Sequence, residues 1–453
     1  MERRRVSMTV MAAVLALAAA FPLAAGGGKE KAPAASSAAA DPASLKGELK
    51  VWTAFGADQG MGDMVAAFNR EYPDIKVTLS KYSNTSDGNI GVDTTLMAGG
   101  EIDVLLNFGA AKTQERALAG LFLDLTDLCT KEKIDLVKEF GSEYRFNDRI
   151  YTLPMGGLSY YVAINMDSWK EAGYGALPKE WTWDEYIEAC RKMTKTVNGK
   201  RMYGGSDYHT IDYFTYPARQ VEGADVYYGK DGLSNFDNPI IRKSLAMKYQ
   251  CEVTEKIWFP LVEYRSNSLQ SQMVILNGTV ASTVITNLTR FVRDRKNYPI
   301  SFKVGFAPYP VMEKGQKNYL SGVPTFSHLG ITANTKNKDA AWAFEKWFAT
   351  KGGVYLTIAG HMPTWSGTNM AGAVDLIFGS EKAASELIDV ESFKRVVFNY
   401  AGPAYKETRF TAVSDIGAVV NDVTMRYMNG KIDLDAAMKE MKERSDAAIK
   451  KAK

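Results

Sequence analysis

The sequence has few cysteines and few histidines. Its three cysteines, Cys129, Cys190 and Cys251, are far apart, and its three histidines lack metal-ligand spacing. We therefore expect no disulfide framework, no metal site and no cofactor, although the oxidation of one cysteine pair is left open. The cysteines are interpreted as small buried hydrophobic residues.

The net charge is small, and the sequence lacks recognisable catalytic motifs. The chain has 55 basic and 52 acidic side chains, a net charge of +3, and Glu2 with Arg3 to Arg5 contributes +2 of it, which leaves +1. This balance gives no electrostatic case for nucleic-acid binding. No Gly-x-Ser-x-Gly elbow occurs, and the neighbouring carboxylates Asp184 and Glu185 are explained by helix capping. The chain is therefore not expected to be an enzyme.

Only one long apolar run is present, at residues 10–23. It follows Arg3 to Arg5 and leads to Ala24 and Ala25, which is typical of a secretory signal peptide at residues 1–25. No later run is long enough for a transmembrane helix, so a soluble exported protein is expected. Residues 26–45 lack large apolar side chains at most positions and predict a flexible tether. The first cysteine is Cys129, so a lipid anchor after the signal is not expected.

The first folded segment alternates strands and helices. Strands are predicted near residues 49–52, 75–79 and 102–106, with helices near 61–72 and 92–97 between them. Such a βαβαβ unit predicts a parallel sheet with right-handed crossovers. Ligands of open parallel sheets bind beyond the carboxyl ends of the strands, which here are residues 52–58, 82–87 and 107–110. None of these loops has a nucleotide-binding glycine pattern.

Later segments also mix strands and helices. Thr182 and Glu185 have capping-box spacing, so a helix should begin near Trp183. Strands are predicted at residues 302–310 and 330–333, and the stripe that includes Phe344 predicts a helix. From residue 371 to the end the pattern is helical. With 453 residues, two domains are expected.

Several segments, taken in order, resemble one protein family. They are Leu153-Pro154, Asn165-Met166-Asp167, Gly173, Thr182-Trp183-Asp184-Glu185, residues 330–350, His361-Met362-Pro363-Thr364 and Met428-Asn429-Gly430. Together they resemble the extracellular solute-binding proteins of ABC importers, the sugar-binding family that includes maltose-binding protein. The resemblance covers about residues 48–450. Each motif is weakly specific by itself, but their order is difficult to obtain by chance.

The resemblance implies an α/β, two-lobe periplasmic binding protein fold with a ligand cleft between the lobes and several hinge crossings. Lobe 1 would comprise residues 46–153 and about 322–364, and lobe 2 about 154–321 and 365–453. The crossings would lie near residues 151–157, 322–324 and 363–367. Gly156, Gly157, Gly322 and Gly367 could absorb a hinge rotation, or they could be ordinary turn glycines.

A sugar site combines aromatic rings with polar side chains that donate and accept hydrogen bonds. Trp52, Phe55 and Asp58 after the first strand, and Asn107 at the end of the third, offer that mixture. For lobe 2, the resemblance points to Tyr213 with Asp212, and to Asn287, where family members often have Trp. Trp365 and Phe410 could supply the missing aromatic surface. Core packing is an alternative for each aromatic residue.

The expected function is capture of a carbohydrate, an oligosaccharide or sugar derivative, in the periplasm and its delivery to an ABC permease by a monomer. Two alternatives remain open. One is a secreted carbohydrate-active enzyme, a glycosidase or lyase, which for hydrolysis would need paired carboxylates across a cleft. The other is the same fold with a phosphate ester, peptide or polyamine as ligand. A phosphate would favour a basic residue in the cleft, and the sequence does not place Arg219 or Arg290.

Overall fold

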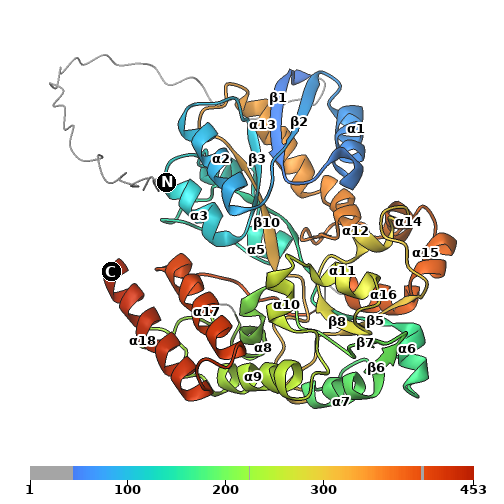
Figure 1. The fold of residues 1–453 in the computed structure, drawn as a ribbon. Helices are drawn as coiled ribbons and strands as arrows, with labels where there is room; N and C mark the ends of the chain where they lie inside the picture. Colours follow the sequence, from blue (N-terminus) through green and yellow to red (C-terminus); the bar gives the residue numbers. More distant parts are fainter. Residues whose placement is uncertain (1–43, 224, 399–401) are drawn as a thin grey trace, which may run out of the picture. The chain divides into compact units, whose positions relative to one another are not determined.

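The computed structural model describes residues 44–223, 225–398 and 402–453. The predicted signal peptide, and all of the predicted tether except its last two residues, lie outside the described residues. The chain divides into two units, Met1–Ala40 and Asp41–Lys453, and the second contains every element reported below. Figure 1 shows its ribbon. Within the described part, no helix is both long and apolar enough to cross a membrane.

A six-stranded mixed sheet organises the first lobe, with strand order β11-β4-β10-β3-β1-β2. Its strands are β1 (Gly47–Thr53), β2 (Ile75–Lys81), β3 (Val104–Phe108), β4 (Leu153–Gly157), β10 (Thr325–Ile331) and β11 (Met362–Pro363). β1 pairs in parallel with both β2 and β3, which confirms the predicted βαβαβ unit. β10 is antiparallel to β3 and β4. It starts at Thr325, earlier than the predicted strand at 330–333.

Helices bury both faces of this sheet, as Figure 1 shows for α1 and α13 on one side and α2 and α3 on the other. Leu49 and Val51 join the core cluster of α1 and α13, whereas Trp52 and Leu105 belong to the cluster of α2 and α3. The alternation follows from the two-residue period of a strand. The helices of this lobe are η2 (Ala57–Gln59), α1 (Met61–Glu71), α2 (Ser86–Met97), α3 (Ala110–Leu118), α4 (Thr126–Glu132), α5 (Leu136–Phe140), α13 (Lys338–Ala349) and η5 (Gly352–Ala359).

The second lobe contains a three-stranded antiparallel sheet with order β8-β5-β9. Its strands are β8 (Ser282–Ile285), β5 (Tyr161–Asn165) and β9 (Val304–Pro308). β5 is buried on both faces: Tyr161 and Ala163 pack in a cluster with α16, and Val162 and Ile164 pack in a cluster with α7. A strand buried on both faces is typically apolar, as most of β5 is, and β8 buries Ser282 and Thr283 with their hydroxyls hydrogen-bonded to Gly204 O and Ser206 Oγ.

The remaining elements surround this sheet or form a helical layer beyond it. They are α6 (Met166–Glu171), α7 (Trp183–Met193), β6 (Lys195–Val197), β7 (Lys200–Met202), η3 (Ile211–Thr215), α8 (Tyr216–Glu222), α9 (Pro239–Tyr249), η4 (Gln250–Thr254), α10 (Leu261–Ser266), α11 (Ser271–Leu276), α12 (Thr289–Val292), α14 (Ala373–Phe378), α15 (Glu381–Leu387), α16 (Val390–Val397), α17 (Val413–Met428) and α18 (Leu434–Ala452). Leu245 of α9, Val420 of α17 and Met438 of α18 share one core.

Local signals in the sequence correctly set several element ends. The capping box at the start of α7 is present, with Thr182 Oγ1 accepting from the Glu185 N–H at 3.2 Å and Glu185 Oε2 accepting from the Thr182 N–H at 2.8 Å. The prediction of helix throughout residues 371–453 is wrong for 402–412, which are not helical. Gly402 and Pro403 open that stretch, and both residue types disfavour helix. The cysteines are buried and unpaired.

The chain passes between the two sheets after β4, after β9 and after β11. β4 keeps residues 153–157 in the six-stranded sheet, so the first crossing follows Gly157. A Cβ added to Gly157 would lie 2.2 Å from the Pro324 carbonyl oxygen, and one on Gly156 would lie 3.1 Å from that of Met362. Close packing of neighbouring strands therefore explains these two glycines without a hinge role.

Candidate ligand-binding cleft

The carboxyl ends of β1, β2 and β3 meet at one edge of the six-stranded sheet, because the three strands are parallel neighbours. Phe55 follows β1, Tyr82 to Asn84 follow β2, and Phe108 ends β3. Tyr82 Oη donates to the Leu106 carbonyl at 2.7 Å, which fixes the second loop against the third strand. This edge is the place where the topology predicts a ligand.

A cavity of about 590 Å³ opens at this edge, and we call it the cleft. Its volume lies within the range of sites for small ligands. Residues from both lobes line it: Ala54, Phe55, Lys81, Tyr82, Ser83, Asn84, Phe108, Phe326 and His361 from the first lobe, and Gln270, Asn287 and Arg290 from the second. A ligand in the cleft would therefore contact both lobes.

Aromatic rings form the first-lobe wall of the cleft. The Phe55 ring lies 5.3 Å from Phe108 and 4.9 Å from His361, and Phe108 lies 5.9 Å from Phe326, as centroid distances. His361 Nδ1 is 3.0 Å from Ser327 Oγ. Burial, with the nearby Arg290 charge, lowers the pKa of His361 to about 3, so its ring is neutral at neutral pH. Phe55 is only 5% exposed, so the half-buried rings of Phe108 and Phe326 supply most of the apolar surface that this wall offers to a ligand.

Asn287 lies on the opposite wall, just after β8. Its φ of 42° is in the left-handed region, which asparagine tolerates better than most residues. Gln272 Nε2 donates to Asn287 Oδ1 at 2.8 Å. A Cβ on Gly360 would lie 2.8 Å from the Asn287 Cα, so the two lobes touch here. The structure thus places Asn287 in the cleft with Phe55, as expected from the sequence.

Asp58 lies beside the cleft and not in it. It lines an adjacent cavity of about 620 Å³ that shares Gln270 and Arg290 with the cleft. The Asp58 side chain is exposed, and its backbone carbonyl accepts a 3.5 Å hydrogen bond from Arg293 Nη1. Asp58 could therefore reach only a ligand that extends beyond the cleft.

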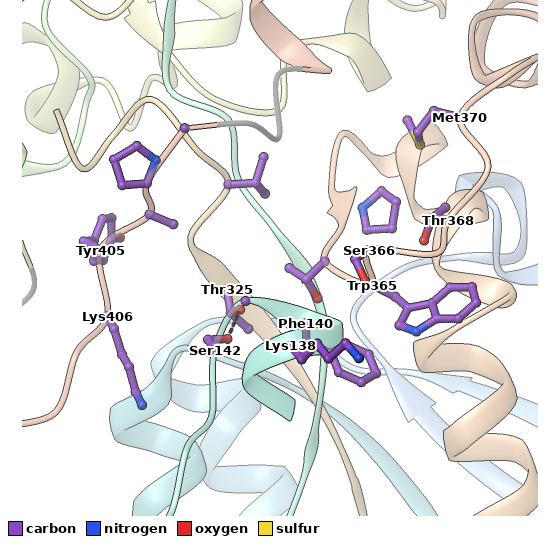
Figure 2. A pocket seen from close by; sticks show the side chains of 17 residues that line it. Lys138, Phe140, Ser142, Thr325, Trp365, Ser366, Thr368, Met370, Tyr405 and Lys406 are labelled. Atoms are coloured by element: carbon purple, nitrogen blue, oxygen red, sulfur yellow. Dashed lines mark hydrogen bonds between the residues drawn. The ribbon is translucent and has the colours of Figure 1, made fainter. Parts of the chain in front are cut away.

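Trp365 belongs to a different cavity, of about 400 Å³. Figure 2 shows Trp365 across this cavity from Tyr405 and Lys406, with the 2.8 Å hydrogen bond between Ser142 and Thr325 beneath. Trp365 Nε1 donates to Glu139 Oε2 at 3.3 Å. The predicted aromatic residues Phe55 and Trp365 thus line two separate cavities.

Tyr213 and Asp212 lie in η3 within a group of tyrosines. The Tyr213 ring is 5% exposed and stacks on Tyr208 at 4.4 Å and on Tyr216 at 4.1 Å. A ring stacked on two neighbours offers little surface to a sugar. Burial raises the pKa of Asp212, and the charge of Arg219 opposes that rise. Neither residue lines the cleft.

Trp52, Asn107 and Phe410 also lie outside the cleft. Trp52 and Phe410 are half-buried against the core cluster of α2 and α3. Asn107 is fully buried, and its Oδ1 accepts a hydrogen bond of 2.6 Å from Arg116 Nη1. These contacts give the three residues a packing role in the described chain.

Ten residues that line the cleft were not among the predicted site residues: Ala54, Lys81, Tyr82, Ser83, Asn84, Phe108, Gln270, Arg290, Phe326 and His361. Asn84 lies in the loop after β2, which the strand rule had indicated. Phe326 and His361 reach the cleft only because β10 and β11 join the first sheet, and Arg290 only because α12 follows β8. His361 belonged to a segment used only for the family resemblance, the sequence did not place Arg290, and no motif marks Gln270 or Phe326.

Comparisons with known proteins agree with this architecture. Residues 53–355, more than half of the chain, match the family model described as bacterial extracellular solute-binding protein. A maltotriose-binding protein from Pyrococcus abyssi is 26% identical over 261 residues, which are 55% of this chain and 52% of that protein. The match thus spans about half the length of that curated relative.

Solved structures share the fold. A sugar transporter from Rhizobium etli, in an open conformation, has a TM-score of 0.70 at 19% identity and covers 89% of this chain and 99% of its own. An ABC substrate-binding protein from Listeria monocytogenes, in complex with cycloalternan, has a TM-score of 0.67 at 17% identity and covers 89% of this chain and 99% of its own. The predicted two-lobe α/β fold is confirmed by these likenesses.

Neither structural likeness identifies a ligand for this chain, since both fall below 25% identity. The family model does not depend on them, because it matches the sequence itself across β1 to η5. The chain belongs to the bacterial extracellular solute-binding protein family.

Proposed function

We propose that this protein captures a carbohydrate, an oligosaccharide or sugar derivative, in the cleft and delivers it unchanged to an ABC permease. The observation that carries the proposal is the cleft itself, in which rings of one lobe face polar side chains of the other. The names of two relatives agree with it, because one binds maltotriose and the other was solved with cycloalternan.

The chemistry of the two walls suits a saccharide. The C–H faces of a sugar ring pack on aromatic rings, here the half-buried Phe108 and Phe326, and its hydroxyls need side chains such as Asn287 and Gln270. A ligand that contacts both walls would favour the conformation in which they are closest, and this would couple binding to lobe closure. Among the residues predicted from the sequence, we propose Asn287 as the principal contact, with Phe55 supporting the Phe108 ring behind it.

The remaining proposals concern the cell and the partners. Membership of an extracellular family supports export of the protein, and we propose that residues 1–25 are its signal peptide and that it acts in the periplasm as a monomer. A glycosidase would need two carboxyl groups across the bound sugar. Among the described residues that line the cleft, none is Asp or Glu, which favours binding over hydrolysis.

A thermal-shift screen of the purified protein tests the proposal, because a ligand that binds only the folded state raises the melting temperature. Mono- and oligosaccharides would be compared with peptides and polyamines, and products would be sought by chromatography. A rise with saccharides and no product is expected. Hydrolysis of the saccharide would instead indicate an enzyme, and a rise with peptides or polyamines alone would contradict the carbohydrate proposal.

The variant Asn287→Gly tests the site. Glycine tolerates the left-handed backbone at this position, so the change removes the amide with little strain. Loss of one or two hydrogen bonds should weaken binding by roughly tenfold. Asn198→Gly is the matched control, since Asn198 has φ 50° in the exposed turn between β6 and β7. Equal affinity of both variants would remove Asn287 from the site.

A further inference from the structure

Arg290 differs from the other large buried cations of the chain. Arg116 pairs with Asp93 at 2.7 Å, and Arg219 pairs with Glu407 at 2.8 Å. Arg290 lines the cleft and is half-buried, its Nε is buried without a hydrogen-bond partner, and it makes no ion pair or hydrogen bond with any described residue. Its guanidinium lies 4.6 Å from the Phe291 ring centroid. Because burial of an unpaired charge is costly, this arrangement calls for a partner from outside the chain.

The same cleft has an excess of hydrogen-bond donors. Asn287 accepts from Gln272 through Oδ1, and Asn84 accepts from Asn89 through Oδ1 at 3.0 Å. In both amides the Nδ2 donors are left without a partner among the described residues. Lys81, which is exposed at the rim of the cleft, likewise has no described acid partner. These donors converge on one cavity.

The nearest acidic residues do not balance this charge. No described residue lining the cleft is Asp or Glu. Asp58 and Asp294 line the adjacent cavity that Arg290 also borders, but neither forms an ion pair with Arg290. The Asp294 carboxylate accepts from Asn297 N at 3.2 Å and from Asn297 Nδ2 at 2.7 Å. Among the described residues, the cleft therefore carries positive charge without a carboxylate to balance it, since Ser83 and Gln270 supply only neutral acceptors.

We propose that the carbohydrate carries an oxyanion, a carboxylate or a phosphate, and that Arg290 pairs with it while Asn287 and Asn84 donate to the same ligand. This inference deepens the proposed carbohydrate function and rests on it. A planar guanidinium can bind a carboxylate or a phosphate through two parallel hydrogen bonds. A neutral sugar would leave the Arg290 charge uncompensated, so the acidic derivative should bind more tightly than its neutral analogue.

Calorimetric titration with matched probes tests this. Trigalacturonate is compared with neutral galactotriose, and glucose 6-phosphate with glucose, so that carboxylate and phosphate sources are separated. We expect one acidic probe to bind at least tenfold more tightly than its neutral analogue, and this preference to fall as salt is raised. Tighter binding of both neutral probes would overturn the inference and leave the carbohydrate proposal intact.

Arg290→Gln should abolish the preference for the acidic probe, so that the acidic and neutral probes bind with affinities that differ by less than about threefold. Arg70→Gln, on the exposed face of α1, removes the same charge and should leave the preference unchanged. Arg290→Lys keeps the charge and should restore part of the preference, and it also serves as the test if the Gln variant does not fold. An undiminished preference in folded Arg290→Gln would overturn the role of Arg290. If the protein bound inorganic phosphate or a peptide but none of the saccharides, the proposed function itself would be contradicted.

Discussion

Glu345 is a carboxyl group held inside the first lobe, on α13 against β4. Its side chain is fully buried, Oε1 accepts the Leu153 N–H at 3.0 Å, and Oε2 has no partner among the described residues. Burial raises the pKa of Glu345 well above 4.5, and the backbone hydrogen bonds only partly oppose it. The folded protein therefore keeps a proton that the unfolded chain releases.

The sign of the pH effect follows from this proton. Between pH 4.5 and the pKa of Glu345 in the folded protein, the folded state binds more protons than the unfolded chain. In this range Glu345 therefore makes the free energy of unfolding fall by about 1.4 kcal/mol per pH unit as pH rises. Glu345→Gln keeps the acceptor for Leu153 and removes the ionisable group. The variant should match the wild type at pH 4 and become progressively more stable above it, by about 1 to 2 °C in melting temperature per pH unit.

Thermal unfolding of both proteins at half-unit steps from pH 4 to pH 8 measures this difference. Glu386→Gln, on an exposed position of α15, is the matched control and should follow the wild type throughout. A Glu345→Gln variant that parallels the wild type at every pH, or is less stable at pH 7.5, would refute the claim that Glu345 is protonated in the fold.

Three further substitutions test the packing. Lys248→Met should lower the free energy of unfolding by about 3 to 5 kcal/mol, because the buried carboxylates of Asp207 and Glu252, at 3.0 and 2.7 Å from Nζ, would lose their cation. Denaturant unfolding measures this loss, and an unchanged stability would contradict the ion cluster. Thr182→Ala should cost about 1 kcal/mol by removing the capping box, as seen in urea midpoints, whereas an unchanged midpoint would argue against it. Gly157→Ala should lower the melting temperature by several degrees, because the clash with Pro324 should cost about 1 to 3 kcal/mol of unfolding free energy. Gly175→Ala, where an added Cβ meets no atom within 4 Å, should not lower it. Equal effects of the two substitutions would disprove the close-packing argument.

Local and periodic features were predictable from the sequence alone. Alternation at Leu49 and Val51 and the helical stripe from Met61 to Phe68 gave the first β-α pair, because a strand or helix buries residues at its own period. The capping box at Thr182 and Glu185 placed the start of α7, because it needs only residues three apart. The parallel pairing of β1 with β2 and β3 then indicated the edge where Phe55 lies.

Other features depended on segments far apart in the chain. Trp52 and Asn107 had suitable side chains at strand ends, but Trp52 packs against the cluster of α2 and α3, and Asn107 is held by a hydrogen bond from Arg116 of α3. The sequence suggested that Tyr213 stacks on a ligand, but in the fold the rings of Tyr208 and Tyr216 stack on it instead.

The sequence by itself determined the elements, their alternating order and the resemblance to a binding-protein family, because each depends on neighbours a few residues apart. Only the tertiary structure decided the composition of the cleft. Its walls combine loops after β1 to β3 with Arg290 and His361, which are brought together by a chain that crosses repeatedly between two sheets. Whether a buried charge has a partner is a property of that assembled space, and so the unpaired Arg290 became visible only there.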